Sequence, residues 1–564
     1  MKPYKSTSPE KTISWVRSIL YEKAGILTRE HHYNGDDEFY SCRVTIANNG
    51  VEEFDIGTNG KGTTVTYAMA SAYGELMERI QNNILINRPN CIQNIRKFVY
   101  APDEQTLVAD ENFISKYGKT FDCEIEKGKV FHTLPYCNVS KKSIEYLPAE
   151  LVRAGCTSNG MCAGNTPLEA ILQGLCEIVE RYVLKLIYEQ NVSFPTIPID
   201  YFEHTSILSK IKEISSCNNW NIEIKDCSCG LIPAVGVLVL NETRTKYLFH
   251  IGAATSMQIA LERALTEIYQ GRNTVELIDI DVEYQTQLLF NDELKNKELN
   301  KTVINGTGQF PISIFEKKGI SYIDEKQWNI SDEDDFKLFL DVFAKMNAEI
   351  YIRDVSYLGF PAYSIFVPQM SQIKEIQLLQ TLSNINIETC SKNNIKKIIN
   401  EISTNNTTIK YRLKRYNNQD FWAKYNSDLI KSLLAYSIND FVTAIDSINK
   451  FISTQDIPAT EITFWQCLRS IMICKKKELD LSYIQNIYGH DVLLSSVRFL
   501  ENRSFMNYMS HKTGLTCEKC SIKNSCHESD VMNLTNALDN IYIRNTPDQN
   551  KLLKLITSKN RYDV

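Results

Sequence analysis

Glutamates recur on one face of two predicted helices, the segments 64–83 and 166–190. In the first segment, Ser71, Glu75 and Glu78 fall on a single stripe because an α-helix turns once every 3.6 residues. In the second segment, three acids also share a face, within about 80° of one another: Glu169, Glu177 and Glu180. Carboxylates gathered in this way are the groups that hold hard metal ions.

A third predicted helix, 256–272, carries Arg263 and Glu267 one turn apart. The order Arg before Glu is the less favourable one for an ion pair on a helix surface, which weakens the explanation as a simple salt bridge. Each helix alone is more typical of a solvated acidic face than of a binding site. Apolar residues surround Glu177 and Glu180 on all but a narrow stripe, so these acids are predicted to lie beside a core. Together, the three helices predict a shared carboxylate site.

Repulsion among partly buried carboxylates must be relieved by protonation, by basic partners or by a hard cation. Oxygen ligands without a nearby histidine favour magnesium or calcium over zinc or copper. Magnesium commonly binds together with phosphate oxygens, and four basic residues are available to contact phosphates: Lys61, Arg79, Arg181 and Arg263. The pattern therefore predicts a nucleoside triphosphate site. It is not a P-loop, since GTNGKGTT does not fit the motif GxxxxGK[ST].

The elements that must position these residues alternate between strands and helices over the first part of the chain. Strand-like segments rich in β-branched and aromatic residues occur at three places: 40–46, 233–240 and 246–253. This alternation predicts an α+β domain with mixed sheets and long helices, which we assign to residues 1–405.

The asparagine-rich stretch 391–410 predicts a domain boundary near residue 405. Beyond it, segments 427–452 and 462–474 show helical periodicity without strand signals. Residues 406–564 are therefore predicted to form an all-α domain. Tetratricopeptide-like is only a loose description of it, because the sequence has no strict repeat of about 34 residues.

Composition excludes several classes of protein. The chain has 564 residues, of which 43% are hydrophobic and 23% charged, as expected for a globular protein with a large core. Its net charge of -6 offers no broad basic surface for nucleic acid. The polar N-terminus has no signal-like apolar segment, and no apolar run approaches the roughly 18 residues that span a bilayer. We expect a cytoplasmic protein that binds neither membranes nor, directly, nucleic acid.

A cysteine cluster near the C-terminus could hold a metal. The segment HKTGLTCEKCSIKNSCHE contains a CxxC pair, a third cysteine and two histidines. The candidate zinc ligands are three thiols and one imidazole: Cys517, Cys520, Cys526 and His511. An iron–sulfur cluster and unligated thiols are the alternatives. The remaining cysteines are expected to be free thiols, because the reducing cytosol disfavours disulfides.

The three predicted helices and the residues before them contain NGKGTT with SAYGELMER, SNGMCAGNT with EAILQGLCEIVERY, and ALERALTEIYQGR. These motifs resemble the YcaO superfamily, in particular its founding, ribosome-associated branch. The resemblance extends to SPEKTI, to YLGFPAYSIFVPQMS and to the helical C-terminal portion. In that family, glutamates on three helices hold magnesium-bound ATP. The resemblance therefore implies a YcaO-type ATP-binding domain followed by the helical domain.

The resemblance also implies roles for individual residues. Six glutamates would bind magnesium: Glu75, Glu78, Glu169, Glu177, Glu180 and Glu267. Four residues would contact phosphates: Lys5, Thr12, Arg181 and Arg263. Three would line the nucleotide pocket: Ser71, Cys162 and Asn165. The catalytic roles would fall to Arg181, Arg263 and Glu267. Thr12 and Cys162 stand where the family pattern has serine; threonine keeps the hydroxyl, whereas a thiol is a weaker hydrogen-bond partner.

Family membership implies that a nucleophile adds to a backbone amide, the amide oxygen attacks the γ-phosphate of ATP, and phosphate is then lost. The substrate would be a peptide or a protein, and a homodimer and a partner protein for substrate recognition or sulfur chemistry are expected. Azoline-forming members usually end in a PxPxP tail, whereas this chain ends in SKNRYDV. This difference favours the branch linked to β-methylthiolation of ribosomal protein S12. The alternatives are a noncatalytic ATP-binding adaptor and a cyclodehydratase or thioamide-forming enzyme.

Overall fold

The computed structural model describes most of the chain in nine segments, with five further residues between 392 and 400: 5–33, 39–86, 98–125, 127–272, 275–323, 326–373, 427–454, 459–501 and 528–557. Two compact units are present. The first comprises 1–86, 97–376 and 533–564, and the second comprises 87–96 and 377–532. The predicted boundary near residue 405 lies outside the described residues. The last 32 residues, 533–564, belong to the first unit rather than to the second.

Three antiparallel sheets are present in the described part of the first unit. The smallest has the order β1 (Thr28–Tyr33), β2 (Tyr40–Ile46), β3 (Gly57–Gly62). The next has the order β11 (Ile278–Asp279), β10 (Lys246–Ala253), β9 (Ala234–Asn241), β8 (Trp220–Asp226). The largest has the order β4 (Gln105–Val108), β5 (Val130–Asn138), β12 (Tyr351–Asp354), β13 (Ala362–Phe366), β7 (Met161–Ala163), and β6 (Ser143–Pro148) also pairs with β5. These strands confirm the three strand-like segments of the sequence.

Three helices follow directly on strands: α2 (Val65–Gln81) after β3, α5 (Pro167–Gln190) after β7, and α7 (Met257–Tyr269) after β10. The three predicted carboxylate-bearing helices are thereby confirmed. The hydroxyl of Thr64 accepts a hydrogen bond from the Tyr67 amide and caps α2. Thr166 caps α5 in the same way, through the amide of Glu169, and Pro167 occupies the first turn.

Glycines let two of these helices lie directly on the strand before them. A Cβ on Gly60 would come within 2.1 Å of the Ala68 carbonyl oxygen in α2. A Cβ on Gly252 would come within 2.3 Å of the Ala260 carbonyl oxygen in α7. Any larger residue would push the helix off its strand. The glycines of the NGKG and IGAA segments therefore fix where the acids of α2 and α7 lie.

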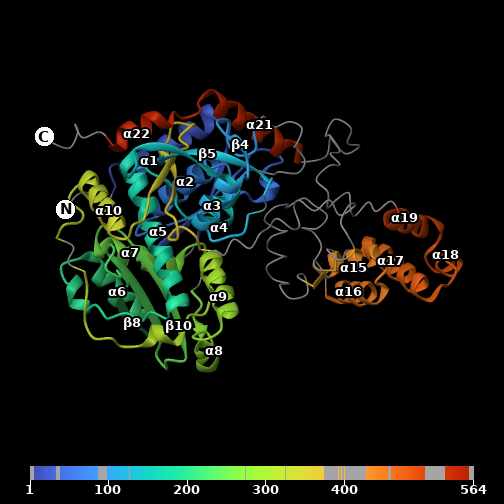
Figure 1. The fold of residues 1–564 in the computed structure, drawn as a ribbon. Helices are drawn as coiled ribbons and strands as arrows, with labels where there is room; N and C mark the ends of the chain where they lie inside the picture. The colour runs from blue at the N-terminus through green and yellow to red at the C-terminus, as the bar shows by residue number, and fades with distance from the viewer. Residues whose placement is uncertain are drawn as a thin grey trace. The chain divides into compact units, whose positions relative to one another are not determined.

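Helix α5 is the central element of the first unit and contacts β7 and β13 on one side and β10 on another. Figure 1 shows it in teal, between the large sheet and the elements α7, β8 and β10. Its apolar stripe, which includes Ile171, Leu175, Val179 and Val183, is fully buried. Burial of each such side chain stabilises the fold by about 1.5–3 kcal/mol.

The remaining helices of the first unit pack on its sheets or on other helices. They are α1 (Pro9–Ser18), α3 (Glu111–Phe121), α4 (Ala149–Cys156), α6 (Ser206–Asn218), α8 (Val282–Gln287), α9 (Asp292–Asn305) and α10 (Asp332–Lys345), with a π-helical turn at Ile19–Lys23 and 3₁₀ turns at Glu52–Phe54, Ile199–Phe202 and Ile312–Phe315. Among them, α6 contacts β8, α4 contacts β5 and β6, and α9 and α10 contact α5. Among the helices of the described segments, none has the length and hydropathy that a bilayer-spanning helix needs.

The described part of the second unit is helical, as the periodicity of its sequence predicts. Its helices are α15 (Ser427–Ser437), α16 (Phe441–Thr454), α17 (Ala459–Lys477), α18 (Ser482–Tyr488) and α19 (His490–Glu501). They enclose a core of their own, in which Leu433, Phe451, Trp465 and Leu468 are almost completely buried. A separate core is what an independent domain requires.

Two C-terminal helices, α21 (Glu528–Arg544) and α22 (Gln549–Thr557), return the chain to the first unit. They are drawn in red beside the blue and cyan strands β4 and β5 in Figure 1. Tyr542 of α21 stacks on Tyr357, with ring centroids 4.2 Å apart. Gln549 of α22 donates to the carbonyl of Asp354 at 3.0 Å and accepts from its amide at 2.9 Å, as a neighbouring strand would.

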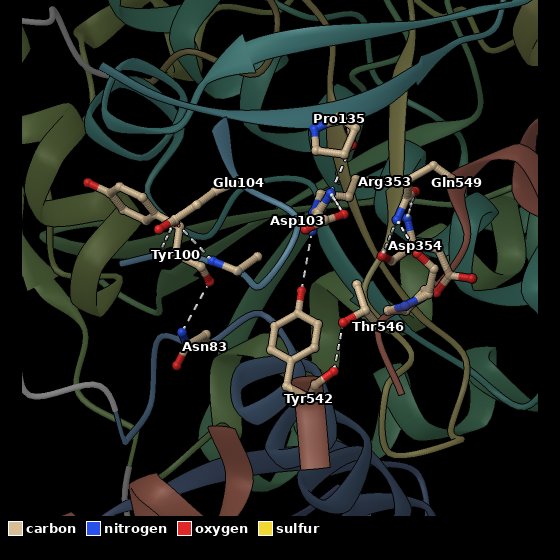
Figure 2. A network of polar contacts seen from close by, with 12 residues as sticks. Asn83, Tyr100, Asp103, Glu104, Pro135, Arg353, Asp354, Tyr542, Thr546 and Gln549 are labelled. Carbon is tan, nitrogen blue, oxygen red and sulfur yellow. Dashed lines mark hydrogen bonds and ion pairs between the residues drawn. The ribbon is translucent and has the colours of Figure 1, made fainter. Parts of the chain in front are cut away.

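The buried guanidinium of Arg353 joins these helices to the large sheet (Figure 2). It donates to both carboxylate oxygens of Asp103, at 2.5 and 3.0 Å. It also donates to the Pro135 carbonyl at 3.0 Å and to the Tyr542 hydroxyl at 3.4 Å. Arg353 is only 1% exposed, so this fork of hydrogen bonds replaces its hydration.

Candidate active site

Helices α2, α5 and α7 bring their predicted site residues close enough to interact. The negative charge of Glu177 on α5 raises the pKa of Glu78 on α2. Arg263 of α7 lies 3.5 Å from Glu180 of α5, measured from Nη2 to Oε2. Lys61, at the end of β3, forms an ion pair with Glu267 of α7. Acids and bases that are spread over roughly 200 residues of the sequence therefore meet in one group. We call this group the glutamate cluster, and its members are Glu75, Glu78, Glu177, Glu180 and Glu267 with Lys61, Arg79, Arg181 and Arg263.

The acids of α2 share one basic partner, Arg79. Its Nη2 lies 3.1 Å from Glu75 Oε1, and its Nε lies 3.4 Å from Glu78 Oε1. Burial alone would lower the pKa of the guanidinium, but the charges of Glu78 and Glu75 raise that pKa above its ordinary value. One cation thus faces two carboxylates.

Glu78 and Glu177 are short of positive charge. Burial raises the pKa of Glu78 well above its usual value, and the charges of Glu177 and Glu75 raise it further against the opposing effect of Arg79. Burial also raises the pKa of Glu177, although Arg181 and Arg79 oppose that shift. A carboxyl group that is driven toward its neutral form marks a place where a further cation would be stabilised.

Lys61 is the most perturbed base of the cluster. Burial and the positive charges of Arg263 and Arg181 lower the pKa of its ammonium to about 7, although Glu180 and Glu75 act in the opposite direction. Its side chain keeps 21% exposure, so solvent or a ligand can reach it. Lys61 and Arg263 are therefore basic groups crowded into one small region, where an anion would relieve their repulsion.

The N-terminal segment reaches the first turn of α5 and surrounds Glu169. The Lys5 ammonium lies 3.5 Å from Glu169 Oε1, and Ser6 donates both its amide and its hydroxyl to Oε2, at 3.0 and 2.6 Å. Asn165 donates its side-chain amide to Oε1 at 3.1 Å, and the Thr12 hydroxyl donates to Asn165 Oδ1 at 2.7 Å. Burial would raise the pKa of Glu169, but Lys5 and the Ser6 hydrogen bonds hold it below its usual value.

The two other predicted pocket residues differ in exposure. Ser71 lies one turn before Glu75 on α2 and is exposed. Cys162 lies on β7 and is fully buried; its thiol donates to the Tyr363 carbonyl at 3.7 Å. Burial and the charges of Glu78 and Glu177 raise the pKa of this thiol well above its usual value. The assignment of Cys162 to the nucleotide pocket stays a prediction.

The donor set of the glutamate cluster fits a hard cation and a phosphate group. All its acids offer carboxylate oxygens, and two of them, Glu78 and Glu177, lack enough positive charge. Within the described segments, however, no three His, Cys, Asp or Glu residues stand in an arrangement that could hold a metal ion as it is. Three of the carboxylates are instead paired with Lys61, Arg79 and Arg263.

The predicted C-terminal zinc site, Cys517, Cys520, Cys526 and His511, lies outside the described residues. Two other residues at the glutamate cluster were missed from the sequence. In the sequence, the only indication that Ser6 belongs to the site is its position next to Lys5. His250 lies inside a strand of apolar residues, where a lone histidine gives no sign of its neighbours.

Comparisons with known proteins agree with the motif resemblance. The chain is 30% identical over 355 residues to a protein of Escherichia coli (strain K12) named ribosomal protein S12 methylthiotransferase accessory factor YcaO, covering 58% of this chain and 59% of that protein. A second curated relative, from Haemophilus influenzae, is 27% identical, over 56% of this chain and 57% of that protein. The chain therefore spans less than two thirds of the length of these relatives.

Among solved structures, the structure of YcaO from Methanopyrus kandleri bound with AMPPCP and Mg²⁺ aligns with a TM-score of 0.43 and 18% identity, covering 64% of this chain and 91% of that one. A family model described as YcaO cyclodehydratase, ATP- and Mg²⁺-binding, matches residues 59–371, more than half of the chain. This range contains α2, α5 and α7 with all the glutamates of the cluster, whereas Lys5 and Thr12 precede it. The chain belongs to the YcaO family.

Proposed function

We propose that this protein binds ATP with magnesium at the glutamate cluster and uses the γ-phosphate to activate a backbone amide of a peptide or protein. The observation that carries the proposal is the meeting of α2, α5 and α7, where Glu78 and Glu177 lie close to several basic side chains. Burial raises the pKa of both carboxyls although Arg79 and Arg181 oppose the shift. Membership of a family described as ATP- and Mg²⁺-binding supports the proposal.

In this proposal, six carboxylates share the magnesium ions: Glu75, Glu78, Glu169, Glu177, Glu180 and Glu267. Magnesium binding would replace Lys61 and Arg79 as partners of the acids, because a divalent ion neutralises two carboxylates at once. The freed cations would then contact phosphate oxygens, together with Lys5, Arg181 and Arg263. Thr12 would hold Asn165, and Asn165 would hold Glu169, through their hydrogen bonds.

In the proposed reaction, a nucleophile of the substrate or of a partner adds to the amide carbon and gives up its proton to a base. The former amide oxygen then forms a bond to the γ-phosphorus of ATP while the bond from that phosphorus to ADP breaks. Orthophosphate leaves with that oxygen as the amide nitrogen loses its proton and forms a double bond to the carbon. The residues of the chain position and neutralise the charges that move in these steps. Arg181 and Arg263 would stabilise negative charge on the transferring group, and Glu267 would hold the magnesium ion beside it.

The substrate is proposed to be a peptide or protein, presented with a partner protein to a homodimer of this chain. The E. coli relative is named as an accessory factor of ribosomal protein S12 methylthiotransferase, so ribosomal protein S12 is the first substrate to test. Mass spectrometry of ribosomal proteins from cells with and without this protein would detect the mass of a methylthio group. An unchanged spectrum would exclude ribosomal protein S12 as the substrate. It would leave the proposal of ATP binding unaffected.

The decisive experiment measures ATP binding by calorimetry with magnesium and with EDTA. We expect binding only with magnesium, and at least a tenfold loss, about 1.4 kcal/mol, in Glu75→Ala and Glu180→Ala. Glu189→Ala is the matched control, since Glu189 is an exposed acid on the last turn of α5. Equal binding by wild type and both variants would refute the glutamate cluster as the site.

Hydrolysis separates an enzyme from an adaptor. We expect magnesium-dependent release of phosphate that increases when substrate is present. ATP binding that depends on Glu75 and Glu180 without any hydrolysis, with or without candidate substrates, would contradict amide activation. That result would identify a noncatalytic protein whose nucleotide site regulates docking.

A further inference from the structure

A buried serine joins the two elements that carry Lys61 and Glu267. Ser41 lies on β2, opposite Lys61 in the pairing of β2 with β3, and is only 3% exposed. Its hydroxyl donates to the Gly60 carbonyl at 3.0 Å and accepts from the Gly271 amide at 2.8 Å. Gly60 precedes Lys61 on β3, and Gly271 follows the end of α7. One hydroxyl, which can donate and accept at once, therefore links both elements through their backbones.

A second hydrogen bond joins the same two elements. The side-chain amide of Gln270, the residue at which α7 ends, donates to the Asn59 carbonyl at 3.2 Å. The chain then turns away at Gly271, whose φ of 70° lies in the left-handed region that favours glycine. A Cβ on Gly271 would lie only 3.1 Å from Asn59 Nδ2, so the two segments approach closely. The two links hold residues 59–61 against the last turn of α7.

These hydrogen bonds are made by neutral groups, whereas the contact beside them is an ion pair. Lys61 pairs with Glu267 across the same boundary between β3 and α7. In the proposed function, magnesium takes Glu267 and a phosphate group takes Lys61, so their direct contact is lost when the ligand binds. Hydrogen bonds between neutral groups do not depend on that exchange of charges. They would keep β3 on α7 in the bound state, where the ion pair no longer does.

We propose that Ser41 is a positioning residue, which fixes Lys61 against α7 so that its ammonium meets a phosphate group of the nucleotide. Ser41 itself touches no ligand in this proposal, because it is buried and its hydroxyl already bonds two backbone groups. The ligand of Lys61 rests on the proposed function, whereas the link between Ser41 and the position of Lys61 rests on the hydrogen bonds. Small displacements of a charged group at such a site reduce its effect strongly.

The first test measures how fast acetic anhydride modifies Lys61 in the full chain without nucleotide or magnesium. Mass spectrometry gives the rate relative to that of Lys142, an exposed lysine of the same chain. We expect Ser41→Ala to raise the relative rate about twofold or more, because loss of the hydroxyl loosens the pairing of Lys61 with Glu267. Equal rates in wild type and Ser41→Ala would overturn the proposal.

Ser228→Ala is the matched control for this substitution. Ser228 is 2% exposed, and its hydroxyl also donates to a backbone carbonyl and accepts from a backbone amide, both of Ala234. Neither Ser228 nor Ala234 belongs to the glutamate cluster. Modification of Lys61 should therefore stay at the wild-type rate. An equal rise in Ser41→Ala and Ser228→Ala would reflect general loosening of the fold and would refute positioning by Ser41.

Gln270→Ala provides a second variant that removes the other link, and it keeps the test decisive if Ser41→Ala does not fold. We expect it, too, to raise the modification rate of Lys61. Gln372→Ala is its control, because it removes an equally long hydrogen bond, 3.2 Å, from a glutamine amide to the Thr120 carbonyl. If Ser41→Ala does not fold and Gln270→Ala behaves like Gln372→Ala, the proposal is wrong.

Magnesium–ATP binding, measured by calorimetry, separates positioning from a general structural role. Ser41→Ala should weaken binding about fivefold in the wild-type background. In Lys61→Met the side chain to be positioned is absent, so adding Ser41→Ala should change binding by less than about twofold. Full and independent effects of the two substitutions would overturn the proposal. If the wild type binds no magnesium–ATP, the proposed function fails, whereas the modification of Lys61 still decides on Ser41.

Discussion

The Arg353 network and the glutamate cluster both hold charged side chains away from water, but they compensate those charges differently. Arg353 has an opposite charge in Asp103 and two neutral acceptors, the Pro135 carbonyl and the Tyr542 hydroxyl (Figure 2). In the glutamate cluster, Glu78 lies near Glu177, and Lys61 lies near Arg263. Like charges therefore remain close together in the cluster.

This difference separates a structural role from a functional one. A compensated buried charge contributes to the stability of one conformation, whereas neighbouring like charges lower stability until a ligand neutralises them. Stability given up at a binding site is a common cost of function. Four substitutions, taken in order of decreasing effect, test whether the two clusters divide in this way.

Breaking the Arg353 network should have the largest effect. Arg353→Met leaves the partly buried Asp103 carboxylate without its partner and should lower the free energy of unfolding by about 3–5 kcal/mol. Urea denaturation monitored by circular dichroism measures this change. Arg29→Met, which breaks the exposed pair with Glu52, is the control and should change stability by less than about 1 kcal/mol. Equal effects of the two substitutions would show that the buried Arg353 network contributes no more to stability than an exposed ion pair does.

His250 should make the stability of the fold at the glutamate cluster sensitive to acid. Burial lowers the pKa of its imidazole to about 3, and the positive charges of Arg272, Lys61 and Arg181 contribute to that shift. Between its unfolded pKa of about 6.5 and its folded pKa of about 3, only the unfolded chain binds the proton, so stability falls as pH falls through this range. At pH 5 the loss is roughly 2 kcal/mol. His250→Asn should remove this loss of stability. The difference in unfolding free energy between pH 7 and pH 5 should then be smaller than in the wild type.

The carboxyls of Glu78 and Glu177 act in the opposite sense, because their raised pKa values make the folded state bind protons first and gain stability as pH falls. They are present in both proteins, so the difference between wild type and His250→Asn isolates the histidine. The exposed His31 provides the control substitution, His31→Asn. An unchanged acid response in His250→Asn would contradict a buried neutral imidazole.

Neutralising one acid of the cluster should weaken ligand binding without weakening the fold. Glu177→Gln is expected to lower magnesium–ATP affinity at least tenfold, about 1.4 kcal/mol, and to leave the unfolding free energy without ligand unchanged or slightly higher. Calorimetry and urea denaturation on the same preparation provide both values. A fall in stability comparable to that of Arg353→Met would show that Glu177 is structural.

The smallest effect is expected where neutral hydrogen bonds hold α22. Gln549→Ala removes the reciprocal pair with the Asp354 backbone and should cost about 1–2 kcal/mol. Hydrogen exchange at the Asp354 amide should also become faster. Asn550→Ala is the neighbouring control, since the Asn550 side chain is bonded to Asp548 at the surface. No change in exchange would mean that the pair contributes nothing to docking of α22.

Local sequence patterns predicted the elements of the site well. The stripe of Glu75 and Glu78 on α2, and the extent of helix α5, depend on residues close in the chain, where helical spacing is decisive. Family membership predicted by the motifs is confirmed by the family match. The roles of individual residues as ligands of magnesium or ATP stay predictions.

Long-range contacts could not be predicted in the same way. Nothing near Gln549 in the sequence indicates that its amide continues the pairing of Asp354, which lies 195 residues earlier. The three basic residues whose charges act on His250 likewise come from three separate elements that meet in space. The prediction of one helical domain over 406–564 also missed that residues 533–564 belong to the first unit. Both parts are helical, and helical periodicity does not reveal which core a helix joins.

The return of the C-terminal helices has a consequence for synthesis of the protein on the ribosome. Residues 377–532 must be translated before residues 533–564 exist. Strand β12 can therefore form its hydrogen bonds to Tyr542 and Gln549 only after that delay. At the usual rates of translation this delay is roughly ten to thirty seconds. During it, the buried side of Arg353 lacks its last partner, and the nascent first unit is open to chaperones or to premature association.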